Sequence, residues 1–222
     1  MILLDMDGTI LHSDKAIIKI VLHNNLKEGR IYKMSATTTC TAEEALKKLK
    51  EGNQQYLTAQ KNEGNISLAL RKKTCEEGQT PYAIVITCSD SRVIPESIFS
   101  AGIGELFVIR VAGNVIDKHQ LGSIEYAAGH LGSRLIVVMG HNHCGAVGAA
   151  IGHGGENYIK YITDEISKAI GTETDDYKAC CLNVQHSVKV IADSLGIKQD
   201  DEHGLQVCGA VYHLEDGSVE FL

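Results

Sequence analysis

The sequence has no tryptophan, three phenylalanines and two prolines among its 222 residues, whereas glycine occurs 22 times. So few prolines, together with the lack of any low-complexity tract, argue against a disordered chain. The shortage of large aromatic residues and the many glycines predict a core of small side chains and many tight turns. No apolar run approaches the roughly 18 residues that a membrane-spanning helix needs. We therefore expect a soluble globular protein with no membrane partner.

Positive charge is also in the minority, because 21 Lys and Arg face 28 Asp and Glu, which gives a net charge of −7. Nucleic-acid binders normally present a basic face, so we expect no nucleic-acid partner. The first residues, MILLDMDGTI, carry acids where a secretory signal peptide would carry bases. These features predict a cytoplasmic protein.

Short apolar runs alternate with helix-like segments along most of the chain. The runs are 82–87, 106–109, 135–139 and 205–212, and helical patterns lie between them. The first three runs are continuously apolar and rich in β-branched residues, which is typical of strands buried on both faces of a parallel sheet. The sequence thus predicts an α/β fold with a central, mostly parallel sheet flanked by helices. A turn at Glu215–Gly217 predicts a C-terminal hairpin at the sheet edge.

The chain divides into a short N-terminal zone and one large domain. Residues 23–40 are polar and read as a linker. After them, Thr41 and Glu44 have the spacing of a capping box that opens a helix. We therefore separate residues 1–34 from a domain of residues 35–222.

Two of the seven cysteines stand directly after predicted strands. In a cytosolic chain, cysteines are more often metal ligands, catalytic groups or buried small side chains than disulfides. Cys88 opens the stretch Cys-Ser-Asp-Ser-Arg, and Cys144 closes the stretch Gly-His-Asn-His-Cys. Because the carboxyl ends of parallel strands line one crevice, Cys88, Asp90, His141 and Cys144 are expected to meet there.

Two thiolates and an imidazole form a ligand set that zinc accepts in tetrahedral geometry. Three protein ligands leave the fourth position for water or substrate, which is typical of a catalytic site, although His143 could complete a structural one. The alternative is that Cys88 and Cys144 are ordinary core thiols. Two such cysteines in polar turns, with histidines beside the second, favour the metal.

From about residue 42 to residue 222 the sequence resembles the β-class carbonic anhydrases, through the motif pair Cys88-Ser-Asp-Ser-Arg92 and Gly140-His-x-x-Cys-Gly145. The resemblance implies one Zn²⁺ per chain, with Cys88, His141 and Cys144 as its ligands. It implies reversible hydration of carbon dioxide to bicarbonate and a proton by zinc-bound hydroxide. Zinc is known from carbonic anhydrases to lower the pKa of bound water to about 7.

The same resemblance implies a catalytic pair, Asp90 and Arg92. Asp90 would accept a hydrogen bond from the hydroxide, and Arg92 would keep Asp90 ionised and oriented. Released by Arg92, the Asp90 carboxylate could instead close the fourth position of the metal. The sequence leaves both states open.

Weaker matches concern the substrate pocket. Gln79 resembles a substrate-orienting glutamine, Phe107 and Tyr126 match apolar pocket residues, and the Gly145 N–H is a candidate donor to a substrate oxygen. Phe107 and Tyr126 could equally be core residues. Members of the family take some pocket residues from a neighbouring subunit, so the resemblance implies a homodimer and permits a tetramer.

Two other functions remain open at the level of sequence. The same zinc site could hydrolyse carbon disulfide or carbonyl sulfide, or the chain could be a non-catalytic zinc-binding or bicarbonate-binding protein. One regulatory bicarbonate pocket of the family is built around a tryptophan, and Val85 stands at that position here. That form of regulation is therefore not expected.

Residues 3–11, Leu-Leu-Asp-Met-Asp-Gly-Thr-Ile-Leu, resemble the first motif of the haloacid dehalogenase superfamily. In that family Asp5 would be the nucleophile and Asp7 a general acid beside Mg²⁺. The later motifs and the body of that fold have no room before residue 35. We expect a remnant without phosphatase activity.

Overall fold

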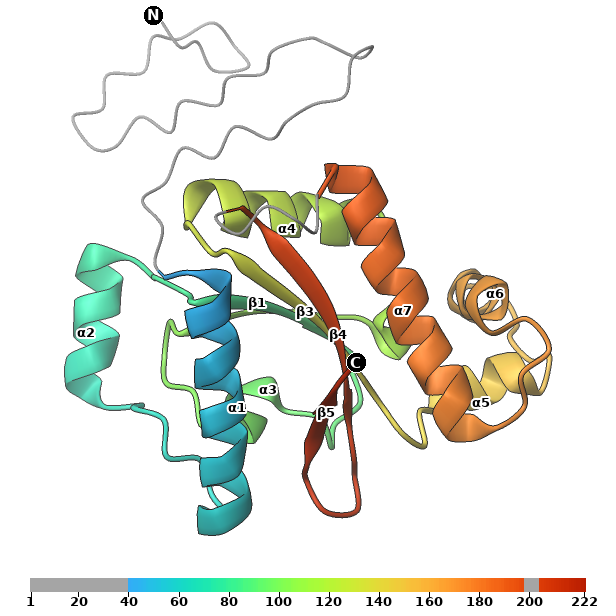
Figure 1. Ribbon diagram of the computed structural model, residues 1–222, viewed down its shortest axis with the longest axis horizontal. Coiled ribbons are helices and arrows are strands. Elements are labelled where there is room, and N and C mark those ends of the chain that lie inside the picture. The colour runs from blue at the N-terminus through green and yellow to red at the C-terminus, as the bar shows by residue number, and fades with distance from the viewer. Residues whose placement is uncertain (1–39, 198–203) are drawn as a thin grey trace, which may run out of the picture.

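A computed structural model describes residues 40–197 and 204–222 of the chain (Figure 1). These residues contain one five-stranded sheet in the order β2-β1-β3-β4-β5. Four strands are parallel, and the last is antiparallel to its neighbour. The strands are β1 (Ala83–Thr87), β2 (Leu106–Arg110), β3 (Leu135–His141), β4 (Gln206–Tyr212) and β5 (Val219–Phe221). The predicted α/β fold and its C-terminal hairpin at the sheet edge are confirmed.

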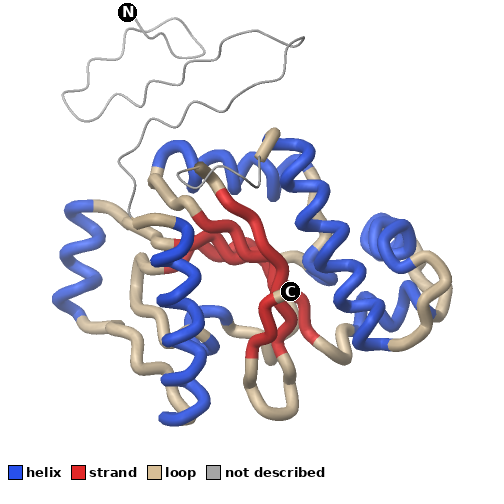
Figure 2. Tube along the Cα trace, viewed as in Figure 1, coloured by secondary structure: helices blue, strands red, loops and turns tan. Residues whose placement is uncertain are grey.

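The helices form layers on both sides of this sheet (Figures 1 and 2). One side carries α1 (Ala42–Ala59) and α3 (Pro95–Ile98), and the other carries α4 (Lys118–His130) and α7 (Asp176–Leu195). Two further helices pack together and against α7, namely α5 (Gly145–Ile151) and α6 (Ile159–Ile170). None of the helices in the described part of the chain is long and apolar enough to cross a membrane.

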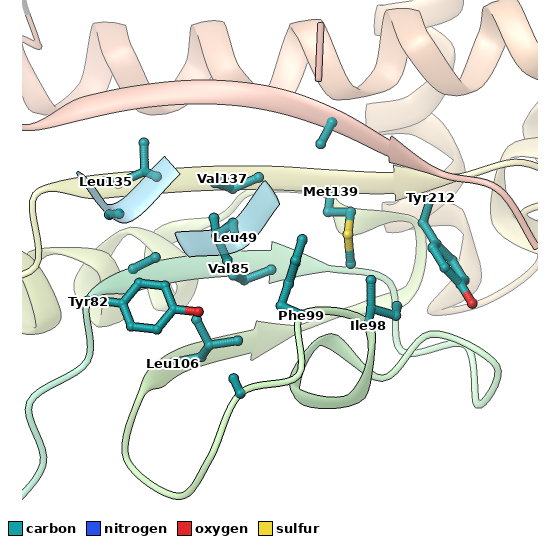
Figure 3. Close-up of a cluster of buried hydrophobic side chains, with 14 of the residues drawn as sticks. Leu49, Tyr82, Val85, Ile98, Phe99, Leu106, Leu135, Val137, Met139 and Tyr212 are labelled. Atoms are coloured by element: carbon teal, nitrogen blue, oxygen red, sulfur yellow. The ribbon is translucent and has the colours of Figure 1, made fainter. Parts of the chain in front are cut away.

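The central strands are buried on both faces because helices cover both. Every residue of β1 and of β3 is buried. On one face, Leu49 of α1 packs with Val85 and Val137 of the sheet and with Phe99 (Figure 3). On the other face, Ile84 and other β-branched residues pack against α4 and α7. Continuous apolar runs in the sequence reflect this two-sided burial.

Helix boundaries follow the local signals where those signals exist. Thr41 caps α1 as predicted: the Glu44 N–H donates to the Thr41 hydroxyl at 3.1 Å, and the Thr41 N–H donates to the Glu44 carboxylate at 2.9 Å. One helix, α2 (Leu68–Glu77), has no counterpart in the sequence prediction. None of its residues is buried, so it lacks the apolar periodicity by which a helix is recognised. Residues 1–34 lie outside the described residues.

The strand order creates a crevice at one place. In the sheet, β2 lies along one edge of β1, and β3 lies along the opposite edge of β1. In open α/β sheets, ligands bind outside the carboxyl ends of the strands at such a switch point. Here the switch point lies between the carboxyl ends of β1 and β3.

Candidate metal centre

Three potential ligands meet at this switch point. Cys88 directly follows β1, His141 is the last residue of β3, and Cys144 immediately precedes α5. Thr87 pairs with Met139 across the two strands, so Cys88 and His141 both lie just beyond this pair, at the carboxyl ends of β1 and β3. All three side chains are buried, and one ligand atom from each lies within 4.8 Å of the others.

The distances among these atoms suit a tetrahedral metal ion. The two sulfurs lie 3.9 Å apart. Two sulfurs bonded to one zinc at about 2.3 Å with a tetrahedral angle would be about 3.8 Å apart. The buried His141 Nε2 has no hydrogen-bond partner among the described residues. A buried nitrogen without a partner is costly, and a metal ion would satisfy it. The residues present therefore fit zinc.

The backbone fixes the orientation of His141. Its Nδ1 lies 2.8 Å from the carbonyl oxygen of Asn142, so Nδ1 donates and Nε2 faces the sulfurs. Asn142 is itself held: its side-chain amide donates to both oxygens of Glu215, at 2.8 and 2.7 Å, and its Oδ1 accepts from the Leu214 N–H at 3.0 Å. Burial lowers the pKa of His141, but the proximity of the Cys88 sulfur and the hydrogen bond to the Asn142 carbonyl outweigh burial, and the net direction is upward.

A hydrogen bond joins the two thiols. Donation from the Cys144 thiol lowers the pKa of Cys88 well below its usual range, and the same hydrogen bond raises the pKa of Cys144. A backbone donor, the Gly113 N–H, also reaches the Cys88 sulfur at 3.3 Å. A dication that binds both sulfurs displaces thiol protons, because thiolates are the ligating form.

An ion pair stands beside these ligands. Arg92 donates to both carboxylate oxygens of Asp90, and Asp90 Oδ2 lies 3.9 Å from His141 Nε2. The Arg92 hydrogen bonds hold the pKa of Asp90 below its usual range, so Asp90 is ionised at neutral pH. The Asp90 side chain is 18% exposed and that of Arg92 54% exposed, which places the pair at the mouth of the site.

Arg110 supports the loop that carries this pair. Its Nε donates to the Cys88 carbonyl at 3.2 Å, and its Nη2 donates to the Asp90 carbonyl at 2.7 Å. The side chain thus ties the end of β2 to the loop after β1.

Three residues that the sequence assigned to the substrate pocket lie away from Cys88 in the fold. Phe107 pairs with Ile84 near the amino end of β1, and its ring centroid is 6.2 Å from that of Tyr126. Gln79 precedes β1 and lies beside Gly104, the turn that leads into β2. These residues are therefore at the end of the sheet opposite Cys88. Gly145, by contrast, follows Cys144 directly, at the start of α5.

Sequence reasoning missed the surroundings of His143. This residue has a φ of 52°, its N–H donates to Asp176 Oδ2 at 2.8 Å, and its Nε2 lies 3.1 Å from Glu215 Oε1. The Arg92 guanidinium reaches its carbonyl at 3.3 Å. Asp176 and Glu215 lie more than 30 and 70 residues away along the chain. No local motif could have identified them.

Comparison with known proteins gives a consistent result. Residues 83–219 match the family model described as carbonic anhydrase. A carbonic anhydrase of Mycolicibacterium smegmatis is 36% identical over 188 residues, which cover 79% of this chain and 91% of that protein. The β-carbonic anhydrase CafA of Aspergillus fumigatus superposes with a TM-score of 0.59 at 27% identity, covering 81% of this chain and 89% of that chain.

A third similarity shows the fold alone. One of two tetrameric β-carbonic anhydrases of Sordaria macrospora superposes with a TM-score of 0.57 at 24% identity. The match covers 69% of this chain and 91% of that chain.

Proposed function

Because the chain belongs to the carbonic anhydrase family, in its β class, we propose that it hydrates carbon dioxide reversibly at the centre formed by Cys88, His141 and Cys144. The products are bicarbonate and a proton. The observation that carries the proposal is the buried pair of sulfurs, 3.9 Å apart, beside His141 Nε2, which has no hydrogen-bond partner within residues 40–197 and 204–222. All three side chains lie within the residues that match the family model.

We propose that Cys88, His141 and Cys144 hold one zinc ion per chain. Zinc bound there supplies a water that is acidic enough to react at neutral pH, as is known of carbonic anhydrases. Two thiolates and one imidazole suit zinc better than the hard cations, which prefer oxygen ligands.

We assign to Asp90 and Arg92 the orientation of the attacking water. The ionised Asp90 carboxylate accepts a hydrogen bond from this water, and thereby turns a lone pair of its oxygen toward the carbon of carbon dioxide. Arg92 keeps Asp90 ionised and fixed through two parallel hydrogen bonds. The water oxygen bonds to the carbon, and one proton leaves to solvent.

We assign to the Gly145 N–H a hydrogen bond to an oxygen of the substrate. Its N–H belongs to the first turn of α5, where backbone donors have no partner within the helix. A Cβ at this position would meet nothing within 4 Å, so there is open space beside the Gly145 backbone. An N–H there stabilises the negative charge that develops on an oxygen of carbon dioxide as bicarbonate forms.

We further propose a homodimer in which Gln79, Phe107 and Tyr126 complete the site of the other copy. They lie far from Cys88 in their own chain, and Tyr126 is 43% exposed. The β2 strand, which carries Phe107, is an edge strand of the sheet. A dimer is also compatible with a tetramer, the assembly named for the Sordaria proteins.

Co-assembly of two inactive variants tests this arrangement. Cys144→Ser removes a ligand, and Gln79→Ala removes the proposed contribution to the neighbour. Mixed dimers then contain one site with all its groups, so unfolding and refolding the two variants together should restore activity that neither has alone. If Gln79 acts within its own chain, every site in the mixture is defective, and mixing restores nothing.

The alternative functions are less well supported. A sensing protein needs neither the ionised Asp90 nor the Arg92 that fixes it. A site for carbon disulfide or carbonyl sulfide would share the ligands and differ in the access channel. For the compartment, we propose the cytoplasm, since two of the cysteines, Cys88 and Cys144, are assigned to a metal.

The direct test is stopped-flow hydration of carbon dioxide by protein of known zinc content. Fast turnover that scales with bound zinc is the expected result. Absence of turnover in protein with about one zinc per chain would overturn the proposal, and the same sample would then be tested with carbon disulfide and carbonyl sulfide.

Residues 1–34 are proposed to be a remnant beside the catalytic domain of residues 35–222. With only Asp5 and Asp7 of the dehalogenase-like motif, the segment lacks partners for phosphate chemistry. A generic phosphate ester with Mg²⁺ should not be hydrolysed. Hydrolysis that disappears in an Asp5→Asn variant would contradict this assignment.

A further inference from the structure

A backbone turn outside the Cys88 loop contacts the Cys88 sulfur. This is the 3-10 turn of Ala112–Asn114, which follows β2. Its Gly113 N–H donates to Cys88 Sγ at 3.3 Å. Gly113 has a φ of 68°, and a Cβ there would lie 2.7 Å from the Ile166 side chain and 3.0 Å from that of Ala146. Only glycine therefore brings this N–H so close to the sulfur.

Two buried polar side chains of α7 donate to this turn, and of the two only Asn183 reaches Gly113, the residue whose N–H contacts the sulfur. Asn183 and Ser187 are 1% and 2% exposed and stand one helical turn apart. The Asn183 amide donates to the Gly113 carbonyl at 2.8 Å, and the Ser187 hydroxyl donates to the Asn114 carbonyl at 3.1 Å. The same helix otherwise buries apolar groups such as Val184 and Ile191. Burying a polar side chain in such surroundings costs free energy unless it forms hydrogen bonds, and the turn provides a hydrogen-bond acceptor for each of the two.

We propose that Asn183 is a positioning residue that acts on the metal centre through Gly113. By fixing the Gly113 carbonyl, Asn183 keeps the neighbouring N–H directed at the Cys88 sulfur. This hydrogen bond withdraws negative charge from one of the two thiolates. The inference rests on the proposed role of Cys88 as a ligand.

The need for such a bond follows from the ligand set. Two thiolates donate more negative charge to a metal than imidazoles do, which weakens its ability to acidify water. Hydrogen bonds to ligating atoms tune a metal centre from outside its ligand shell. A backbone N–H inside the protein is well suited to this task, because it cannot ionise and is shielded from water.

The test uses cobalt(II)-substituted protein, whose sulfur-to-cobalt charge-transfer band reports the electron density on the thiolates. In Asn183→Leu, the Gly113 carbonyl loses its donor and the turn is no longer fixed. The sulfur then gains electron density, so the band should move to longer wavelength. The zinc form of this variant should lose about 10-fold in activity. Ser187→Ala removes a hydrogen bond to the next carbonyl and serves as the matched control, with the band expected at the wild-type wavelength.

The outcomes separate this inference from the proposed ligand set. A wild-type cobalt protein without a charge-transfer band, or a band that is unchanged in Cys88→Ser, would overturn the ligand assignment. A band that depends on Cys88 but has the same wavelength in Asn183→Leu as in wild type would overturn the role of Asn183 alone. An equal shift in Ser187→Ala and Asn183→Leu would also overturn it, since loosening α7 in general would then be sufficient.

A second measurement needs no variant. In wild-type protein loaded with cadmium-113, the Gly113 amide proton should show a scalar coupling to the metal through the Cys88 sulfur. Such a coupling requires a hydrogen bond to a sulfur that ligates the metal. Its absence from an assigned Gly113 resonance would overturn the inference.

Discussion

The guanidinium of Arg92 donates to both carboxylate oxygens of Asp90, at 2.9 Å from Nε to Oδ1 and 2.7 Å from Nη2 to Oδ2. The Arg92 N–H adds a third hydrogen bond, at 2.9 Å to Oδ1. With both oxygens engaged, Asp90 is directed at Arg92 and not at the metal ligands. A metal held by Cys88, His141 and Cys144 would then have its fourth position open to water.

We therefore expect the zinc enzyme to turn over carbon dioxide at pH 7 as well as near pH 9. The pKa of Asp90 is lowered by Arg92, so the pair stays ionised across this range. Stopped-flow rates at the two pH values check this, with zinc content measured on the same samples. Turnover confined to the higher pH would contradict the expectation, because it would indicate that Asp90 leaves Arg92 and binds the metal at pH 7.

Arg92→Ala should lower kcat/KM at pH 7 by about 10- to 100-fold, as is typical when a group that orients a metal site is removed. Asp90 loses its fixed partner, and the His143 carbonyl loses the donor that reaches it at 3.3 Å. Lys73→Ala is the control, because it breaks an exposed ion pair with Glu77 at 3.8 Å that contributes little. Equal rates for the two variants would show that Asp90 needs no positioning by Arg92.

Cys144→Ser should lose bound zinc and activity together. A serine hydroxyl at neutral pH is a poor substitute for a thiolate ligand of zinc. Metal analysis after gel filtration and the hydration rate provide the measurement, and Cys75→Ser, which changes an exposed thiol, provides the control. A Cys144→Ser protein that is free of zinc and fully active would rule out every mechanism that uses the metal.

Stability should fall above pH 10 because of Tyr82. Burial raises the pKa of this tyrosine, with Glu105 acting in the same direction. The folded protein therefore keeps a proton that the unfolded chain releases above pH ~10. The stabilisation is complete below that pH and is lost as the pH rises further.

Urea unfolding of wild type and Tyr82→Phe at several pH values tests this effect. The difference in unfolding free energy between the two should be constant up to about pH 10 and should then change to the disadvantage of wild type. Other titrating groups are the same in both proteins and cancel. A constant difference up to pH 11 would mean that Tyr82 ionises as readily in the folded state as in the unfolded chain.

The ligand set could be predicted from sequence because each ligand belongs to a short motif after a continuously apolar strand. Parallel strands bring their carboxyl ends together, so two local signals were sufficient to place Cys88 beside His141. Asn183 and Glu215 lie 70 and 73 residues from their partners and belong to no motif. Their roles follow only from how α7 and the C-terminal hairpin pack.

The sequence alone did not show that Gln79, Phe107 and Tyr126 lie far from the proposed metal ligands of their own chain. The register of β1 and β2 places Phe107 opposite Ile84, and the sequence carries no signal for register. Helix α2 was missed for a different reason, since none of its residues is buried and its sequence has no apolar stripe. Local periodicity reveals an element only when that element packs on the core of its own chain.

Cys88 and Cys144 are separated by 56 positions along the chain. At a ribosomal rate of about 5–20 residues per second, Cys88 leaves the ribosome roughly 3–11 s before Cys144. Throughout that interval the first thiol has neither its sulfur neighbour nor His141, so it meets metals and oxidants as an unprotected cysteine. Maturation of the enzyme in the cell is therefore vulnerable during translation, and the yield of correctly metallated chains should depend on the free zinc and peroxide present at that time.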